Sequence, residues 1–215
     1  MNKKEFWKRR LAGIKGKAVI GLTGPIASGK SLALELFRGE GAFCVSTDAL
    51  AAEVLTSPAC YNRISRKFGP EKILTNGLLD KKRLAAEVFR APAKRKWLEE
   101  LLHPEILKRT YSLIKRSKAK IAVVEAPLLF EAGLQDCFLL TVCLAAPGRL
   151  LEERALERGW SRAEYRARAR AQFSPERKAE LASLTLENAG GRPELAAKVK
   201  FLCGFLKELN KGKAR

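Results

Sequence analysis

The sequence has little of the chemistry that builds metal centres, disulfide frameworks and membrane spans. It contains one histidine, His103, which excludes a histidine-based metal site or relay, and five irregularly spaced cysteines without a C-x-x-C pair. That cysteine pattern indicates reduced core residues rather than disulfides or a zinc site. No run of 18 or more apolar residues occurs, so we expect no transmembrane helix. The basic segment 1–17 lacks the apolar core of a secretory signal, and we expect a soluble, cytoplasmic protein.

Acidic residues are also scarce, since 42 lysines and arginines stand against 23 aspartates and glutamates and give a net charge of +19. Such an excess fits a nucleic acid, an anionic surface or a polyanionic small substrate. Basic residues crowd both ends of the chain, where charge usually marks a solvated tail. Aromatic residues make up 7% of the chain and do not alternate with basic ones as in stacking surfaces. We therefore expect no stable nucleic-acid partner. We also expect no membrane partner, and a monomer or weak oligomer.

The most informative segment is Gly-Pro-Ile-Ala-Ser-Gly-Lys-Ser at 24–31, which matches the phosphate-loop pattern G-x-x-x-x-G-K-[ST]. An apolar run at 18–23 predicts a strand before the loop, and 32–37 predicts a helix after it. This order aims backbone N–H groups and the positive end of a helix at one point, which suits a polyphosphate. We expect Lys30 to reach the β- and γ-phosphates of ATP and Ser31 to ligate Mg²⁺. The predicted nucleotide-binding residues here are Gly24, Pro25, Ile26, Ala27, Ser28, Gly29, Lys30, Ser31 and Leu32.

Four further apolar segments, at 42–46, 120–126, 138–144 and 183–186, predict strands that alternate with helices. This alternation predicts an α/β fold with a parallel sheet flanked by helices. Asp48 follows one predicted strand and Glu125 ends another. Because parallel strands bring their carboxyl ends to one edge, we expect both carboxylates beside the phosphate loop. The glycines are spaced wrongly for a dinucleotide-binding fingerprint.

The sequence predicts a single domain, 1–215, with a core at about 18–48, 119–148 and 180–209. A basic N-terminal extension is expected at 1–17. Residues 49–118 predict a helical insertion able to hold a second substrate, with helices at 49–55, 81–89, 92–102 and 105–116. An arginine-rich segment at about 149–175 predicts two charged helices around Gly159. Its arginines form either a salt-bridged solvent face or a lid over a triphosphate, and its place after the fourth strand favours the lid.

Five motifs in one order resemble the dephospho-CoA kinase family. Besides the phosphate loop, 68–80 is similar to F-G-x-x-I-L-x-x-G-x-L-D, 98–106 to L-x-x-I-x-H-P-x-I, 127–131 to P-L-L-F-E, and Gln172 with 188–190 to the end of the lid and the adenine-side loop. The resemblance covers about 18–190. It implies a P-loop kinase that transfers the γ-phosphate of ATP to the ribose 3′-hydroxyl of dephospho-CoA.

Together with the resemblance, these patterns assign roles to individual residues. Asp48 is expected to act as the base, and Lys30 and Arg154 to stabilise the transferred group; Ser31 and Glu125 are expected to hold Mg²⁺. Further nucleotide contacts are expected from Arg158, Asn188 and Gly190. The expected substrate-binding residues are Asp48, Leu79, Asp80, Lys81, His103, Pro127, Leu128 and Glu131. Plainer alternatives are a helix N-cap for Asp48, a packed residue for His103 and a loop cap for Glu131.

The sequence departs from the family pattern at several positions. Pro25 and Ala27 replace the usual glycines, so that Pro25 removes one loop N–H and Ala27 is acceptable only with a negative φ. The other departures are Leu32 for Thr, Ser46 for Asp, Ala52 for Arg, Lys81 for Arg and Glu125 for Asp. Two rival functions stay open: another small-molecule kinase, such as a nucleoside monophosphate kinase, and a nucleic-acid-binding NTPase that uses the positive charge.

Overall fold

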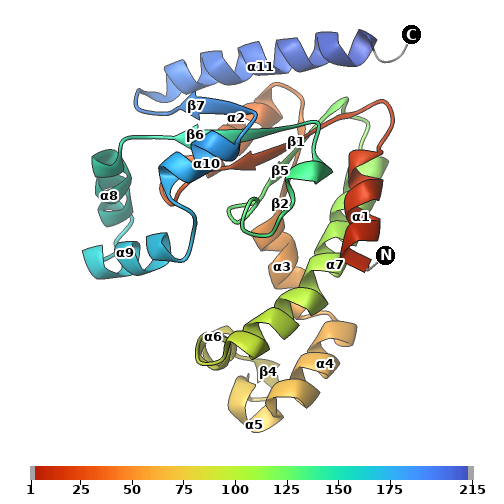
Figure 1. Cartoon of the computed structure of the whole chain (residues 1–215), viewed down its shortest axis with the longest axis vertical. Helices are drawn as coiled ribbons and strands as arrows, with labels where there is room; N and C mark the ends of the chain where they lie inside the picture. Colours follow the sequence, from red (N-terminus) through yellow and green to blue (C-terminus); the bar gives the residue numbers. More distant parts are fainter. Residues whose placement is uncertain (1–2, 213–215) are drawn as a thin grey trace.

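The computed structural model describes residues 3–212 and is built around a five-stranded parallel sheet (Figure 1). The strand order is β2 (Phe43–Ser46), β5 (Ile121–Glu125), β1 (Ala18–Thr23), β6 (Leu140–Ala145) and β7 (Leu184–Glu187). β1 is buried along its whole length, as expected of a central strand in a sheet that is covered on both faces. The parallel α/β fold expected from the alternating pattern is confirmed.

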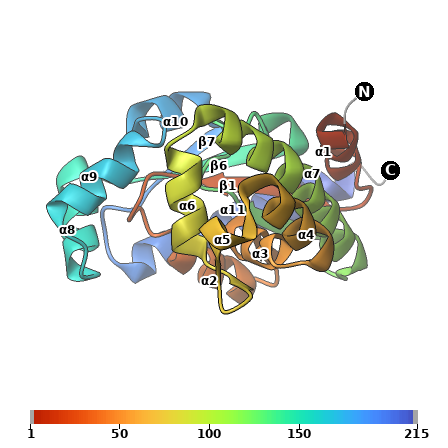
Figure 2. The same cartoon turned by 90° about the horizontal axis from the view of Figure 1, so that it is seen from below.

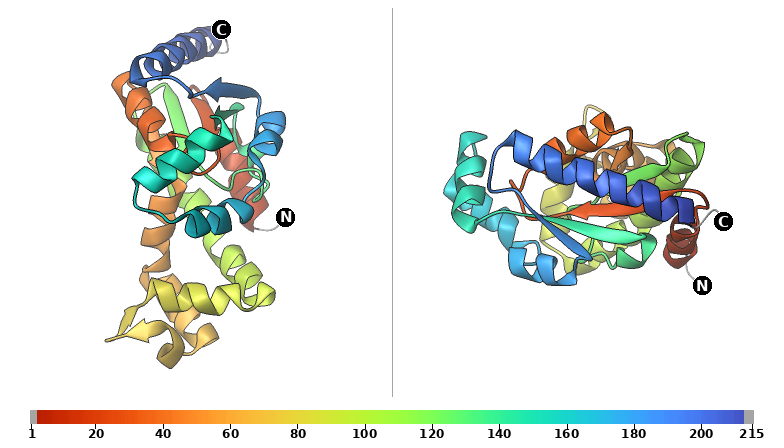
Figure 3. Two further views of the ribbon diagram at one scale, coloured as in Figure 1. Left: turned by 90° about the vertical axis from the view of Figure 1, so that its left-hand side faces the viewer. Right: turned by 90° about the horizontal axis from the view of Figure 1, so that it is seen from above.

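Alternate residues of β1 enter two separate hydrophobic cores, because successive side chains of a strand point to opposite faces. Ile20 packs with α2 (Lys30–Gly39) and with α11 (Arg192–Gly212), which lies across the sheet (Figure 3). Val19 packs on the other side, with α7 (Pro92–Arg116) and α1 (Lys3–Ala12). Each central strand is therefore fixed between two helical layers.

The insertion lies below the sheet in Figure 1 and in front of it in Figure 2, and it has its own core, which includes Ile64, Phe68 and Leu84. It consists of α3 (Thr47–Leu55), α4 (Pro58–Phe68), α5 (Pro70–Ile73), the hairpin β3 (Leu74–Thr75) and β4 (Leu78–Leu79), α6 (Lys81–Phe89), and the first part of α7. The expected break at Pro104 is wrong, because α7 is one continuous helix of 25 residues. Pro104 is buried in α7, as are Leu101 and Leu107 on either side of it. This packing offsets the loss of the backbone hydrogen bond that proline cannot donate.

After β6 the chain forms an arm of α8 (Gly148–Glu157) and α9 (Arg162–Arg170), and returns through α10 (Pro175–Leu181). Gly159 separates α8 and α9 with a φ of +83°, and Ser161 begins α9 with a capping box to Glu164. No residue of α9 is buried, and the helix packs against α8. Among residues 3–212, no helix is long and apolar enough to cross a membrane.

The N-terminal segment is not the solvated tail that its charge suggested. α1 packs against α7 and against the short helix η1 (Gln135–Cys137); Leu11 is fully buried and the Trp7 ring lies 5.7 Å from that of Tyr111. The apolar pair Trp7 and Leu11, one helical turn apart, explains the packing. At the other end of the chain, the basic residues Lys213 and Arg215 lie outside the described residues.

Candidate active site

The phosphate loop has backbone geometry that only glycine allows at two positions. Gly24 and Gly29 have φ values of +146° and +95°, and Gly29 is the N-cap of α2. A Cβ atom on Gly24 would lie 2.4 Å from the carbonyl oxygen of Leu144, and one on Gly29 would lie 2.3 Å from Nδ2 of Asn188. The loop therefore closes tightly on its neighbours and directs the first N–H groups of α2 outward.

Ala27 does not have the negative φ that we expected of it, since its φ is +63°. The Ser28 N–H donates to the Pro25 carbonyl at 3.3 Å and closes a turn in which Ala27 is the third residue. A positive φ at that position is normal for turns that carry glycine there. Alanine adopts it at a cost of about 1–2 kcal/mol, because its Cβ approaches the following carbonyl.

Lys30 is folded back over its own loop. Its Nζ donates to the carbonyls of Gly24 at 3.0 Å and Pro25 at 2.8 Å. Burial lowers the pKa of Lys30 to about 8, while the negative charges of Glu125 and Asp48 act in the opposite direction. Lys30 is thus within electrostatic reach of both carboxylates that were expected beside the loop.

Asp48 lies in the first turn of α3, directly after β2. The helix begins earlier than expected, at Thr47, and Ser46 is its N-cap, so the alternative of Asp48 as the N-cap is wrong. Burial raises the pKa of Asp48, and Lys30 lowers it in part. Ser46 pairs with Glu125, which also pairs with Leu22, so the three strands end side by side at the edge that bears the phosphate loop.

Ser31 and Glu125 are the candidate magnesium ligands. Ser31 is exposed in the first turn of α2, and Glu125 is half-buried at the end of β5. A hydroxyl and a carboxylate oxygen are ligands that Mg²⁺ prefers when phosphate oxygens and water complete its shell. Within the described part of the chain, no group of three or more metal-ligating side chains exists, so phosphate oxygens would have to supply the remainder.

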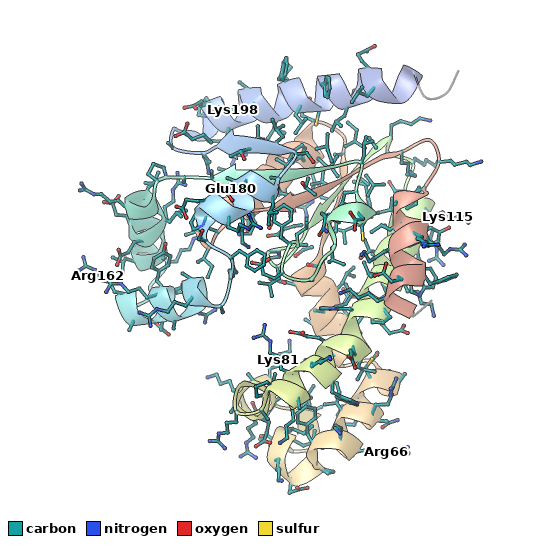
Figure 4. The ribbon with its side chains drawn as sticks, viewed as in Figure 1. Arg66, Lys81, Lys115, Arg162, Glu180 and Lys198 are labelled. Carbon is teal, nitrogen blue, oxygen red and sulfur yellow. The ribbon has the colours of Figure 1, made fainter. Side chains whose placement is uncertain are left out.

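Arginines of the arm fall into two classes. On α9, Arg162 and Arg166 lie 3.6 and 3.7 Å from the Glu152 carboxylate, and Figure 4 shows Arg162 at the outer end of the arm. On α8, Nη1 of Arg154 is buried, and no atom of residues 3–212 accepts a hydrogen bond from it. Arg158 is exposed at the C-cap of α8. The salt-bridged surface is therefore present between α8 and α9, whereas the lid stays a prediction, for which Arg154 is the candidate.

Asn188 is almost fully buried behind the phosphate loop. Its side-chain Nδ2 donates to the Ser28 carbonyl at 2.8 Å, and its N–H donates to the Ala145 carbonyl at 2.7 Å. Gly190 follows at the surface, before α11. This position makes Asn188 an anchor for the loop, a contact that the N-x-G pattern alone did not indicate.

Apart from Asp48, the expected substrate residues lie either at a cavity and the loop that leads to it or on the insertion. His103 and Glu131 line one cavity of about 840 Å³ together with Lys4 of α1 and Lys108 of α7. Burial, and next the charge of Lys4, lower the pKa of His103. Pro127 and Leu128 lie in the loop that runs from β5 to Glu131, and Leu128 is 39% exposed.

Leu79, Asp80 and Lys81 lie on the insertion, where Figure 4 labels Lys81. Asp80 is the N-cap of α6, and its carboxylate accepts the N–H groups of Lys82 and Arg83 at 2.9 and 3.1 Å. Those hydrogen bonds lower its pKa. Leu79 packs against the core of the insertion, and Lys81 is exposed. Asp80 therefore has a local structural use, and the structure does not bring it into the group around Lys30.

Lys178 on α10 is a residue of this region that no sequence pattern indicated. Its side chain is fully buried, and its Nζ donates to the carbonyl of Pro127 and to Oε1 of Gln172 and pairs with Glu131 at 3.1 Å. It sits in a short, charged Pro-Glu-Arg-Lys segment that reads as solvent-exposed. The only available signal was the resemblance of the neighbouring Gln172 to the end of a lid.

Comparison with known proteins gives matches over most of the chain. The model of the dephospho-CoA kinase family matches residues 18–194. Relatives named dephospho-CoA kinase include one from Anaeromyxobacter dehalogenans, 38% identical over 92% of this chain and 94% of its own length. Another, from Thermus thermophilus, is 37% identical over 86% of this chain and 90% of its own length. The structure of TT1252 from Thermus thermophilus has a TM-score of 0.81 at 36% identity, covering 88% of this chain and 98% of that one.

Proposed function

This chain belongs to the dephospho-CoA kinase family, and from that premise we propose that it transfers the γ-phosphoryl group of ATP to the ribose 3′-hydroxyl of dephospho-CoA. One observation carries the proposal: Lys30 of the phosphate loop and Asp48 after the neighbouring strand are close enough for each to shift the pKa of the other. A phosphate-binding cation and a proton acceptor within one site are what transfer to an alcohol requires.

Lys30 would exchange its hydrogen bonds to the Gly24 and Pro25 carbonyls for bonds to phosphate oxygens. Arg154, whose buried Nη1 has no acceptor among the described residues, would cover the transferred group and stabilise its charge. Asp48 would orient the incoming hydroxyl and accept its proton. Its raised pKa makes it a better proton acceptor than an ordinary aspartate, as long as the pH stays above that value.

The donor set at the loop fits a magnesium ion. Ser31 and Glu125 would hold it, the latter directly or through a bound water. Bound there with ATP, Mg²⁺ would supply charge neutralisation at the phosphates. For the acceptor we propose the cavity that His103 and Glu131 line. Pro127 and Leu128, in the loop that leads to Glu131, would contribute from beside it.

We also propose that the enzyme acts in the cytoplasm, as a monomer or weak oligomer. All five cysteines are free thiols and four of them are buried, which suits a reducing compartment. Light scattering of the purified protein measures the oligomeric state.

The direct test is an ATP-consumption assay with dephospho-CoA against a panel of nucleoside monophosphates and other alcohols. Phosphate transfer to dephospho-CoA far above the panel supports the proposal. Preference for a nucleoside monophosphate, or ATP hydrolysis that nucleic acid stimulates with a steep salt dependence, would instead support one of the two rival functions.

A further inference from the structure

We infer that Lys178 is a positioning residue for the proposed phosphoryl transfer, because its ammonium group fixes the end of the lid and the loop after β5 relative to the phosphate loop. This inference rests on the proposed function. Nothing in the family resemblance pointed to this residue, and it contacts none of the candidate catalytic side chains. Its effect would act through the segments that it joins.

The Lys178 ammonium group makes all of its hydrogen bonds inside the protein. An ammonium group has three donors, and here it meets three acceptors: the Pro127 carbonyl, Oε1 of Gln172 at 3.2 Å and Oε1 of Glu131 at 3.1 Å. The side chain has no exposed surface. A buried charge costs several kcal/mol of desolvation, and apolar residues of similar volume often replace such a charge without loss. Stability alone is therefore a weak reason to keep a lysine at this position.

The three acceptors of Lys178 belong to two segments, the base of the arm and the loop after β5. Gln172 ends the arm that carries α8 and α9, and the N–H of the next residue, Phe173, donates to Glu131 at 2.7 Å. Glu131, in the loop after β5, therefore binds the base of the lid at Phe173. Lys178 in turn contacts both Gln172 of the lid and Glu131 of the loop. Figure 1 shows α10 between the sheet and the arm, as this contact requires.

The hydrogen bonds of Lys178 also connect to the strand end that carries the phosphate loop. The Pro127 carbonyl that accepts from Lys178 also accepts the hydroxyl of Thr23 at 3.3 Å, and Thr23 immediately precedes Gly24. Lys178 is also close enough to Lys30 to lower its pKa. A single buried ammonium group thus connects the lid that carries Arg154 to the strand end that carries the nucleotide loop.

A lid held in the wrong position would admit water to the γ-phosphate, so the loss should appear as uncoupling of ATP consumption from transfer. The test measures KM for ATP, kcat and the ratio of ATP consumed to CoA formed in Lys178→Met, Gln172→Leu and Glu131→Gln. We expect a rise in KM for ATP of about tenfold, a fall in kcat and a larger share of hydrolysis. Arg177→Met, an exposed neighbour on α10, serves as the matched control.

The double variant K178M/E131Q separates positioning from folding. Removing Lys178 alone leaves the Glu131 carboxylate buried without its cation, whereas the double variant leaves no uncompensated charge. We expect its uncoupling to be no greater than that of the more severe single variant, because both residues act as one unit. Normal coupling in the double variant and in Gln172→Leu, as in Arg177→Met, would overturn the inference. Absence of transfer to dephospho-CoA in the wild type would instead overturn the proposed function.

Discussion

The side-chain amide of Asn188 donates a 2.8 Å hydrogen bond to the carbonyl of Ser28, although 160 residues separate the two in the sequence. A Cβ atom on Gly29 would collide with the same amide. The residue that follows β7 therefore fixes the backbone of the phosphate loop from behind.

Asn188→Ala should loosen that loop. A buried carbonyl that loses its donor costs about 1–3 kcal/mol, so the free energy of unfolding should fall by that amount. Displaced loop amides should also weaken ATP binding about tenfold. Calorimetry and thermal unfolding measure the two effects. Glu187→Gln, next to Asn188 but with an exposed side chain, should change neither, and equal behaviour of the two variants would contradict the anchoring role.

Ala27→Gly should leave stability unchanged or increase it by up to about 1.6 kcal/mol. Relief of the left-handed strain at φ +63° contributes about 1–2 kcal/mol, and the greater freedom of glycine in the unfolded chain removes about 0.4–1 kcal/mol. Ala33→Gly, in the interior of α2, is the control and should destabilise the protein by about 1 kcal/mol or more. Chemical denaturation compares them, and a larger loss in Ala27→Gly would show that no strain is stored there.

Arg154→Ala should lower the rate of transfer about 100-fold or more, since the proposed stabilisation of charge on the transferred group would be lost. Stability should change little, because no hydrogen-bond acceptor in the described chain is left unpaired. Arg162→Ala, which removes only an exposed 3.6 Å ion pair, should keep a nearly normal rate. Similar rates for the two variants would refute the distinction between α8 and α9.

The pKa of Lys30 predicts proton uptake when ATP binds. Folding lowers that pKa to about 8 from 10.5, and bound phosphate favours the charged lysine. Near pH 8 about half of the free protein has a neutral Lys30, so binding should take up about half a proton, and almost none at pH 6. Titration calorimetry in two buffers of different ionisation enthalpy measures it. Lys30→Arg, always charged, should show no uptake from this position; equal uptake would assign the proton elsewhere.

Much of the fold could be predicted because the strands of the five-stranded sheet are short apolar runs. The phosphate loop could be predicted because its backbone has a positive φ at Gly24 and Gly29, which favours glycine there. The placement of Asp48 near Lys30 followed from the rule that parallel strands share a carboxyl edge, whereas the strand order was not predicted. The break at Pro104 was predicted wrongly because a local rule was applied where tertiary packing decides. α1 was missed because its charges obscured the Trp7 and Leu11 spacing.

The rest of the site depends on contacts between distant segments. Asn188 donates to Ser28, and Lys178 joins Pro127 to Gln172. These are isolated polar contacts, and no periodic pattern in the sequence indicates them. Ala27 was misjudged for a related reason. The turn from Pro25 to Ser28 requires a positive φ at its third position, whatever residue the sequence supplies.

The central claim is that Asp48 accepts the proton of the alcohol that attacks the phosphate held by Lys30. The most direct measurement is the single-turnover rate of phosphate transfer to dephospho-CoA by Asp48→Asn, with ATP affinity measured on the same sample. The account predicts a folded protein with ATP affinity within about twofold of the wild type and transfer at least about 100-fold slower. A folded variant that binds ATP and transfers phosphate at the wild-type rate would contradict it.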